Sequence, residues 1–262
     1  MSTFASDFLN DFDERWNEVE LLIHMAEQME DEEFKHQVLC RTTIVLIVAN
    51  FEGFLNEIVR CLIKDINANQ FFRFTSSRMK RTYCTQFFGD ERGNEKKITK
   101  LIGKFDELDA LYDIEPFLYE NNKNPKASVI EKLFNEISNK EFFAYLTECD
   151  LEEVFENEMS VTNGYVNKLK NAALSGTDNF PYQLELDGLG FNLDKKKAPA
   201  DCLWKLFMNE TLKARHTVAH GISQDNTMSL LEIKKTKEKI KILELSFAIL
   251  ILQNSIEVHN PS

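Results

Sequence analysis

Residues Thr43–Phe54 read T-I-V-L-I-V-A-N-F-E-G-F, and their apolar side chains cover nearly every face of a helix. A helix that is apolar all round is buried in a protein core or in a membrane. This run is shorter than the roughly 20 residues that span a bilayer. Helical periodicity continues on both sides, over about Glu32–Asn67, with Gly53 as the only glycine. We therefore predict one long helix at the centre of the fold.

Further long helices are predicted on both sides of this one. Apolar residues recur at three- and four-residue steps over 4–30. Pro199 suits the first turn of a helix over about 200–219, which ends at Gly221. A last helix is predicted over about 229–258 and begins with S-L-L-E, which resembles a capping box. Glycine and proline are sparse, at nine and five residues, which favours an all-α bundle of long antiparallel helices.

The middle of the chain, 70–198, is less regular, and we predict it to be a mainly helical insertion at one end or side of the bundle. Short helices are predicted over 95–111, 127–139, 141–148 and 160–174. Ser175–Ala198 is a long connection in which a short hairpin is predicted at Tyr182–Leu193. No internal repeat is visible. We expect a single domain over 1–262, with core helices over 4–68 and 199–258.

The net charge of the chain limits where a surface that binds nucleic acid could lie. The formal net charge is −12, and the sequence pI is about 5.0. Any surface that binds phosphate must therefore be a local basic patch on an acidic body. Candidates are Lys195, Lys196, Lys197 and Lys213, together with a basic stretch over 73–104; solvated surface charge is the alternative interpretation of all of them. Tyr83, Phe87 and Phe88 are candidates to stack on bases or to pack in the core.

Cysteine usage favours a reducing compartment. The chain has five cysteines, which is an odd number, and no two of them have C-x-x-C spacing. This usage is typical of buried thiols rather than of disulfides or a zinc site. The first residues lack a basic segment followed by an apolar one, so no signal peptide is expected. The longest apolar runs, Thr43–Ala49 and Leu245–Leu252, are too short to cross a bilayer. We expect a cytoplasmic protein with no membrane partner.

The most informative short motif is Ala214–Gly221, which reads A-R-H-T-V-A-H-G. RNA cleavage through the 2′-hydroxyl needs a proton acceptor, a proton donor and a fixed cation for the phosphate, and it requires no metal or other cofactor. Histidine suits the proton transfers, and the guanidinium of arginine suits the phosphate. We predict His220 as general acid or base, Arg215 as phosphate clamp, and His216 as a residue that orients the scissile group or supports His220.

A structural interpretation of the motif stays open. Basic residues are common at helix C-termini, where they interact with the helix dipole. In that case Arg215 and His216 are solvated, and His220 binds carbonyls at the helix end. Arg215 and His220 are also five residues apart, about 140° around an ideal helix. They meet only if the helix ends or tightens before His220, or if a symmetry-related copy completes the site, which predicts a homodimer.

The motif resembles the R-[polar]-x-x-x-H signature of the HEPN superfamily, whose all-helical domains include many metal-independent endoribonucleases. Residues Ile47–Glu57, I-V-A-N-F-E-G-F-L-N-E, resemble the core helix "A-x-[aromatic]-E-G/A-[aromatic]-L" of standalone HEPN nuclease-like families, including the RiboL-PSP group. The resemblance covers about 4–68 and 199–258. The segment between them resembles no family that we can name.

The resemblance implies roles for particular residues. Arg215 and His220 match the catalytic pair, and His216 matches the polar residue that follows the arginine. Glu52 matches a recurrent acidic position that would support Arg215 or a histidine, although a surface carboxylate at this helix position is an equal alternative. The family implies dimers in which two motifs share one cleft. HEPN toxins that are modified on a tyrosine two residues after the histidine differ from this chain, which has Ile222 there.

The resemblance implies an endoribonuclease that leaves 2′,3′-cyclic phosphate and 5′-hydroxyl ends, and that serves as a toxin or anti-phage effector with RNA as substrate. An antitoxin or another regulatory protein would then be a partner. The alternative is a non-catalytic HEPN-like module for dimerisation or nucleotide binding. A third hypothesis makes the last two helices a structural dimer core in which the motif is incidental. No zinc-protease, kinase, dehydrogenase or esterase motif is present in the sequence.

Overall fold

The computed structural model describes residues 2–89, 93–118, 125–219 and 228–257, and the all-α prediction is confirmed for them. The α-helices are α1 (Phe4–Asn10), α2 (Asn17–Gln28), α3 (Glu33–Ala68), α4 (Ser77–Thr85), α5 (Glu95–Leu108), α6 (Ala127–Asn135), α7 (Phe142–Tyr145), α8 (Met159–Thr177), α9 (Leu203–Ala219) and α10 (Leu230–Asn254). The 3₁₀ helices are η1 (Glu14–Trp16), η2 (Phe72–Phe74), η3 (Glu115–Phe117) and η4 (Asp150–Phe155). Within the described ranges the only β pairing is an isolated bridge between Thr75 and Ile256.

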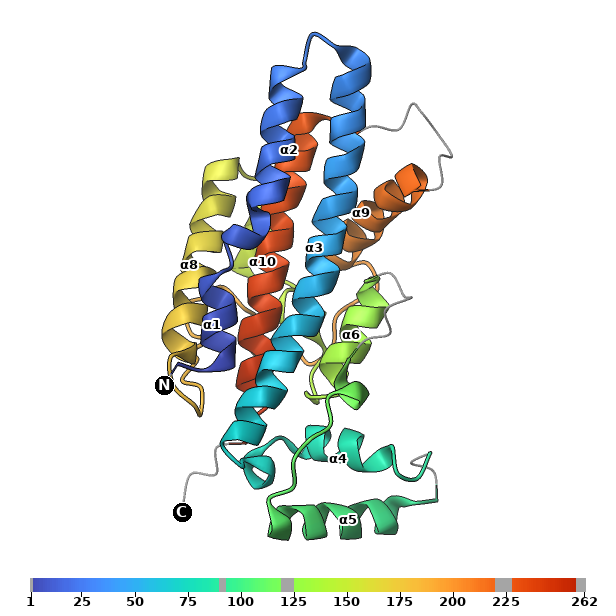
Figure 1. Cartoon of the computed structure of the whole chain (residues 1–262), viewed down its shortest axis with the longest axis vertical. Helices are drawn as coiled ribbons and strands as arrows, with labels where there is room; N and C mark the ends of the chain where they lie inside the picture. The colour runs from blue at the N-terminus through green and yellow to red at the C-terminus, as the bar shows by residue number, and fades with distance from the viewer. Residues whose placement is uncertain (1, 90–92, 119–124, 220–227, 258–262) are drawn as a thin grey trace.

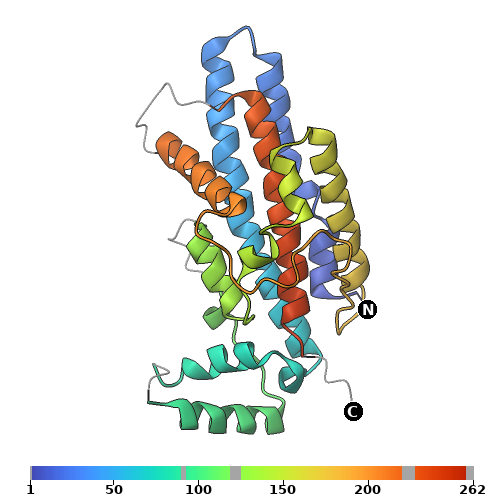
Figure 2. The ribbon, with the colours of Figure 1, turned by 180° about the vertical axis from the view of Figure 1, so that it is seen from behind.

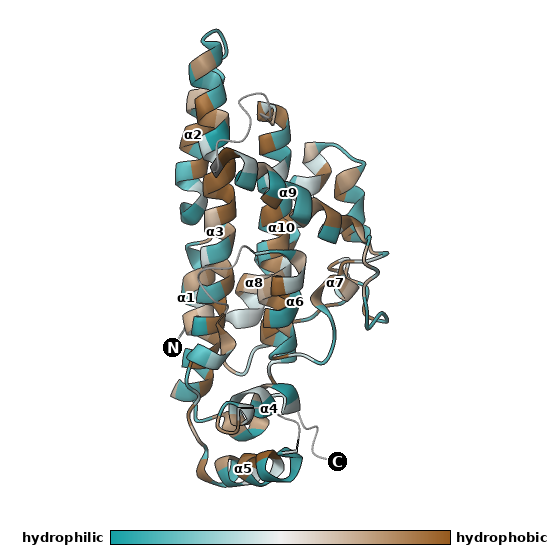
Figure 3. Ribbon diagram, turned by 90° about the vertical axis from the view of Figure 1, so that its right-hand side faces the viewer, coloured by the Kyte–Doolittle hydropathy of each residue, from teal (hydrophilic) through white to brown (hydrophobic). Residues whose placement is uncertain are grey.

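The predicted central helix is α3, within a residue of its expected bounds. It packs against α1, α2, α9 and α10, and α8 covers the other side of α10 (Figure 1). The view from behind shows the same long helices side by side (Figure 2). Coloured by hydropathy, α3 and α10 carry long apolar stretches along the bundle (Figure 3). Burial of these apolar faces against one another is the main driving force for the fold.

In length and composition, α3 would also suit a membrane span. Its apolar side chains have protein partners instead: Ile47, Phe51, Phe54 and Ile58 have no exposed surface. Burial of these four side chains is typical of a helix in a protein core.

The N-terminal stretch 4–30 is not one helix, contrary to the pattern-based prediction. It divides into α1, η1 and α2, with a turn after Asn10. The divided path buries both Phe12 and Trp16 at 1% exposure. Asp65 of α3 fixes the start of α1, since its two carboxylate oxygens accept the N–H groups of Phe4 and Ala5 at 2.8 and 3.0 Å. Asp65 thus fixes where α1 begins, and the burial of Phe12 and Trp16 accompanies the break, which local periodicity does not show.

The middle segment contributes to the bundle and also extends from it. Its longest helix, α8, lies along α10 and α1, whereas α4 and α5 form a pair at the end of the bundle (Figures 1 and 2). The predicted short helices exist as α5 to α8, although α5, α6 and α7 end three to four residues early and α8 runs three residues longer.

The predicted hairpin over 182–193 is wrong, because those residues form turns without a strand. Positive φ angles of 75° at Gly188 and 91° at Gly190 turn the chain there. Side-chain burial holds the segment instead: Leu184 and Leu189 are buried, and the Tyr182 hydroxyl donates to Asp65 at 2.7 Å.

All five cysteines are free, and four are buried while Cys149 is partly exposed. Burial raises the pKa of the Cys61 and Cys149 thiols to about 12 and that of Cys84 to about 11. Thiols with such pKa values stay protonated and unreactive near neutral pH. The cysteines therefore act as small core residues, as predicted.

Candidate functional site

The helix that carries the motif, α9, is anchored at its N-terminal half. Trp204, Met208 and Leu212 lie four residues apart on one face and are at most 5% exposed. The Trp204 ring packs edge-on against Phe155 of η4, with ring centroids 4.9 Å apart. From this anchor α9 runs obliquely past α3 (Figures 1 and 2). The anchor positions the described part of the motif, Ala214–Ala219 at the end of α9, beside α3.

Arg215 lies on the side of α9 that faces α3. Its side chain is half-buried, and its Nε atom is fully buried. Glu52 of α3 lies within electrostatic reach: burial raises the pKa of the Glu52 carboxyl, and the positive charge of Arg215 opposes that rise. The two residues that carry the family resemblance, one from each motif, are therefore brought together across the α3–α9 interface.

His216 faces another direction. Consecutive helical residues differ by about 100° around the axis, and the exposed His216 side chain lines a cavity of about 390 Å³ with Lys126, Asn209, Leu212 and Lys213. Arg215 is not among the residues that line this cavity. Within one chain, α9 thus directs the arginine toward α3 and the adjacent histidine toward α6.

The remaining residues of the motif, His220 and Gly221, and Ile222 after them lie outside the described residues, as does the predicted end of the helix at Gly221. The next helix, α10, begins with the predicted capping box. The Ser229 hydroxyl accepts the Glu232 N–H, and the Glu232 carboxylate accepts the Ser229 N–H in return. The described residues therefore end at Ala219, within the motif, and begin again at Met228.

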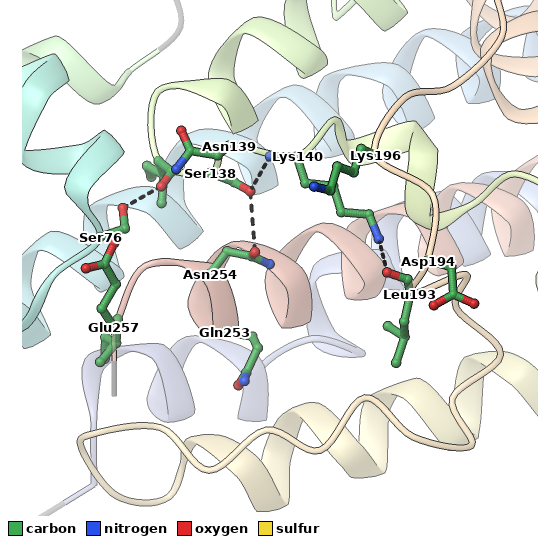
Figure 4. A pocket seen from close by; sticks show the side chains of 12 residues that line it. Ser76, Ser138, Asn139, Lys140, Leu193, Asp194, Lys196, Gln253, Asn254 and Glu257 are labelled. Atoms are coloured by element: carbon green, nitrogen blue, oxygen red, sulfur yellow. Dashed lines mark hydrogen bonds between the residues drawn. The ribbon is translucent and has the colours of Figure 1, made fainter. Parts of the chain in front are cut away.

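The candidate RNA-binding lysines fall into two places. Lys213 lies beside His216, as described above. Lys195 forms an ion pair with Glu148, and Lys196 lines a separate pocket of about 430 Å³ next to the C-terminal end of α10. Figure 4 shows this pocket, where Lys140 donates a 2.8 Å hydrogen bond to the Leu193 carbonyl. Lys197 is exposed on the same connection.

The basic stretch over 73–104 is partly neutralised by nearby acids. Arg73 pairs with Asp109, Arg81 pairs with Glu95, and Lys80 lies 2.9 Å from Asp106. Tyr83 is 5% exposed within an aromatic cluster, so it packs in the core rather than offering a surface for bases. Phe87 is 52% exposed and Phe88 is half-buried.

Sequence reasoning singled out Lys213 but missed Lys126 and Asn209, which also line the His216 cavity. Lys126 precedes α6, and Asn209 lies on the face of α9 next to it; both line the His216 cavity and a second cavity that adjoins it. No sequence pattern links these positions, because the packing of α6 on α9 brings them together. Among the described residues, no group of three or more His, Cys, Asp or Glu side chains is arranged to hold a metal ion.

A helical bundle that joins an aromatic-Glu-Gly core helix to an R-H-x-x-x-H helix defines a HEPN-superfamily domain. The chain belongs to the RiboL-PSP-HEPN family, which it matches over residues 10–253. The match includes the middle segment as well as both motif helices. No curated protein and no solved structure matches the chain significantly.

Proposed function

We propose that this protein is a metal-independent endoribonuclease whose site is completed by a second copy of the chain. The observation that carries the proposal is the electrostatic interaction of Arg215 with Glu52 across the interface of α3 and α9, on the helix that precedes His220 in the sequence. A carboxylate beside a guanidinium restricts its position, and a positioned guanidinium is what a phosphate clamp needs. Membership of a family with a common nuclease activity supports the same chemistry.

In the proposed reaction one histidine removes the proton from the 2′-hydroxyl, and the 2′-oxygen attacks the adjacent phosphorus. The bond from phosphorus to the 5′-oxygen breaks, and a second acid group gives that oxygen a proton. Arg215 neutralises the charge that builds up on the phosphorane. His220 is the proposed acid or base, and His216 orients the scissile group or supports His220. The products are a 2′,3′-cyclic phosphate and a 5′-hydroxyl.

The divergent directions of Arg215 and His216 support a composite site in a homodimer, because two chains supply groups that one helix directs apart. As a cytoplasmic nuclease of this kind, the protein would act as a toxin or anti-phage effector, held in check by an antitoxin or another regulatory protein. We expect no membrane partner.

Cleavage is tested with purified full-length protein and RNA in excess EDTA, with end-group analysis of the products. His220→Ala and Arg215→Ala should each abolish cutting while circular dichroism stays unchanged. His24→Ala, at an exposed histidine on α2, is the matched control and should cut normally. Cutting that persists in His220→Ala contradicts the proposed chemistry.

Mixing the two inactive variants tests the composite site. If each site takes Arg215 from one chain and His220 from the other, half of the dimers are mixed, and each mixed dimer has one intact site. Activity should then return to about a quarter of the wild-type value after subunit exchange. No recovery, although exchange is demonstrated, places both residues of a site on one chain.

The same geometry favours a second candidate, a non-catalytic module for dimerisation or nucleotide binding. Arg215 is half-buried against α3, and an arginine in that position can serve to hold α9 in place. Intact RNA after long incubation with the wild-type protein, together with a large loss of thermal stability in Arg215→Ala, would select this alternative.

A further inference from the structure

A continuous groove follows the junction of α6 and α9, starting at His216. The His216 cavity, of about 390 Å³, shares Lys126 and Asn209 with a second cavity of about 660 Å³. The second cavity continues along α6 to Arg78 on α4. We refer to the two cavities together as the α6–α9 groove. The groove therefore connects the motif helix to the far end of α6.

Basic side chains line the groove along its whole length. From the motif end, they are Lys213, Lys126, Lys205, Lys132 and Arg78. Lys126, Lys132 and Lys213 are exposed. Lys205 is more buried and lies 3.9 Å from Glu131, whereas Arg78 donates through Nε to the Asn135 carbonyl at 2.6 Å. On a chain with a net charge of −12, this is a concentration of positive charge.

Three glutamates line the second cavity, and each already accepts local hydrogen bonds. Glu131 accepts the N–H groups of Phe142 and Phe143, Glu141 accepts that of Ala198, and Glu136 accepts the Thr82 hydroxyl. Their carboxylates thus hold α7, the 194–198 connection and α4 in place. No acid lines the cavity next to His216, among the described residues. The motif end of the groove is consequently its most positive part.

None of the described residues that line the two cavities is Phe, Tyr or Trp, and the imidazole of His216 at the motif end is their one aromatic ring. Surfaces that bind single strands through their bases use aromatic side chains for stacking, whereas cations and amides bind phosphates and sugars. We propose that the α6–α9 groove binds the backbone of a single-stranded RNA segment next to the scissile phosphate, with Lys213 and Lys126 as the nearest contacts. This inference rests on the proposed function, because that function makes RNA the ligand.

A second basic surface competes with this assignment. Lys96, Lys97, Lys100 and Lys104 are exposed on α5 and lie within about 100° of one another around the helix. The α5 lysines lie on the α4–α5 pair at the end of the bundle, away from α9 (Figure 1). They provide a charge-matched control for the groove.

The test measures binding of a fluorescein-labelled single-stranded RNA by anisotropy, in EDTA, at 50 and 200 mM salt. All proteins are full-length and carry His220→Ala, so that the RNA stays intact. One variant adds Lys126→Gln and Lys213→Gln, and its control adds Lys96→Gln and Lys100→Gln. Both double substitutions remove two positive charges, and all four sites are exposed, so the fold should be retained; circular dichroism checks this.

For single strands, the logarithm of affinity falls with that of salt concentration by about 0.7 per phosphate contact. A fourfold rise in salt therefore weakens binding by about 2.6-fold per contact, or about sevenfold for two contacts. The ratio of affinities at 50 and 200 mM salt should fall by about sevenfold in the groove variant and stay unchanged in the α5 variant. The sequence of the RNA should have little influence on this affinity ratio in either variant.

Unchanged affinity and salt dependence in the groove variant would overturn the proposal, and a loss confined to the α5 variant would move the RNA to α5. Failure of the proposed function has a different signature. If the protein with an intact motif leaves RNA uncut while the groove variant loses RNA binding, the groove stands and the nuclease proposal fails.

Discussion

Glu244 of α10 is a carboxyl group within the core of the bundle, and its protonation should control stability. It is 1% exposed, and burial raises its pKa to about 8, against the opposing effects of Arg15, Lys241 and a hydrogen bond from Trp16. That bond joins Trp16 Nε1 to Glu244 Oε2 at 3.2 Å. Oε1 is buried and accepts no hydrogen bond from the described residues. A neutral, protonated carboxyl is therefore the favoured state at neutral pH.

The sign of the pH effect follows from the raised pKa. The unfolded chain loses this proton near the ordinary value of 4.5, whereas the folded chain keeps it until about pH 8. Stability from the neutral group is complete below pH 4.5 and is lost as the pH rises through the folded pKa. One pKa unit corresponds to about 1.4 kcal/mol. Between pH 5.5 and 7.5 this group alone should lower the free energy of unfolding by about 2 kcal/mol.

Glu244→Gln isolates this contribution, because glutamine has a similar shape, stays neutral and can still accept the bond from Trp16. Urea unfolding followed by circular dichroism at pH 5.5, 6.5 and 7.5 gives the free energy of unfolding of both proteins. The variant should gain about 2 kcal/mol on the wild type between the two extremes. The exposed Glu18→Gln on α2 should follow the wild-type profile. Parallel profiles for Glu244→Gln and wild type would refute the reasoning, because they would mean that the buried group is already ionised or solvated.

Three further changes have definite expected outcomes. Ser229→Ala removes the N-terminal cap of α10 and should lower the free energy of unfolding by about 1 kcal/mol, measured in urea. Gly176→Ala places a Cβ 2.4 Å from a Leu184 methyl carbon, and the forced shift should cost about 1–3 kcal/mol in the same assay. In the His220→Ala background, which leaves the RNA intact, RNA affinity should fall as rising pH ionises Glu52, because its carboxylate then competes with phosphate for Arg215; adding Glu52→Gln should remove this pH dependence in anisotropy titrations.

The long helices were predictable because their apolar periodicity and end signals are local. The bounds of α3 follow from its apolar run, and the capping box at Ser229 marks the start of α10. The break after α1 was not predictable, since it goes with the burial of Phe12 and Trp16 against distant parts of the chain, such as Glu244, which accepts a hydrogen bond from Trp16. The hairpin prediction failed for a similar reason: Tyr182, Leu184 and Leu186 alternate with polar residues as in a strand, but they pack against the bundle without forming one.

For the candidate site, too, local sequence patterns reveal some residues, whereas only tertiary packing reveals the others. Arg215, His216 and His220 are close in sequence, so a motif comparison can find them without a structure. The α6–α9 groove joins positions from Arg78 to Lys213, and only tertiary packing shows that they are neighbours. Local motifs therefore lead to the proposed catalytic residues, while the proposed RNA-binding surface can be found only from the fold.

The electrostatic interaction between Glu52 and Arg215 links the core-helix motif to the R-H-x-x-x-H motif in this chain. An arginine beside an ionised carboxylate is held in place but offers less net charge to a phosphate. Burial raises the pKa of Glu52, and the charge of Arg215 opposes that rise. Under the proposed function, a phosphate bound at Arg215 would raise this pKa further, since like charges disfavour ionisation. Glu52 would then attract Arg215 while it is ionised and would leave more of the arginine's charge to the phosphate once it is protonated.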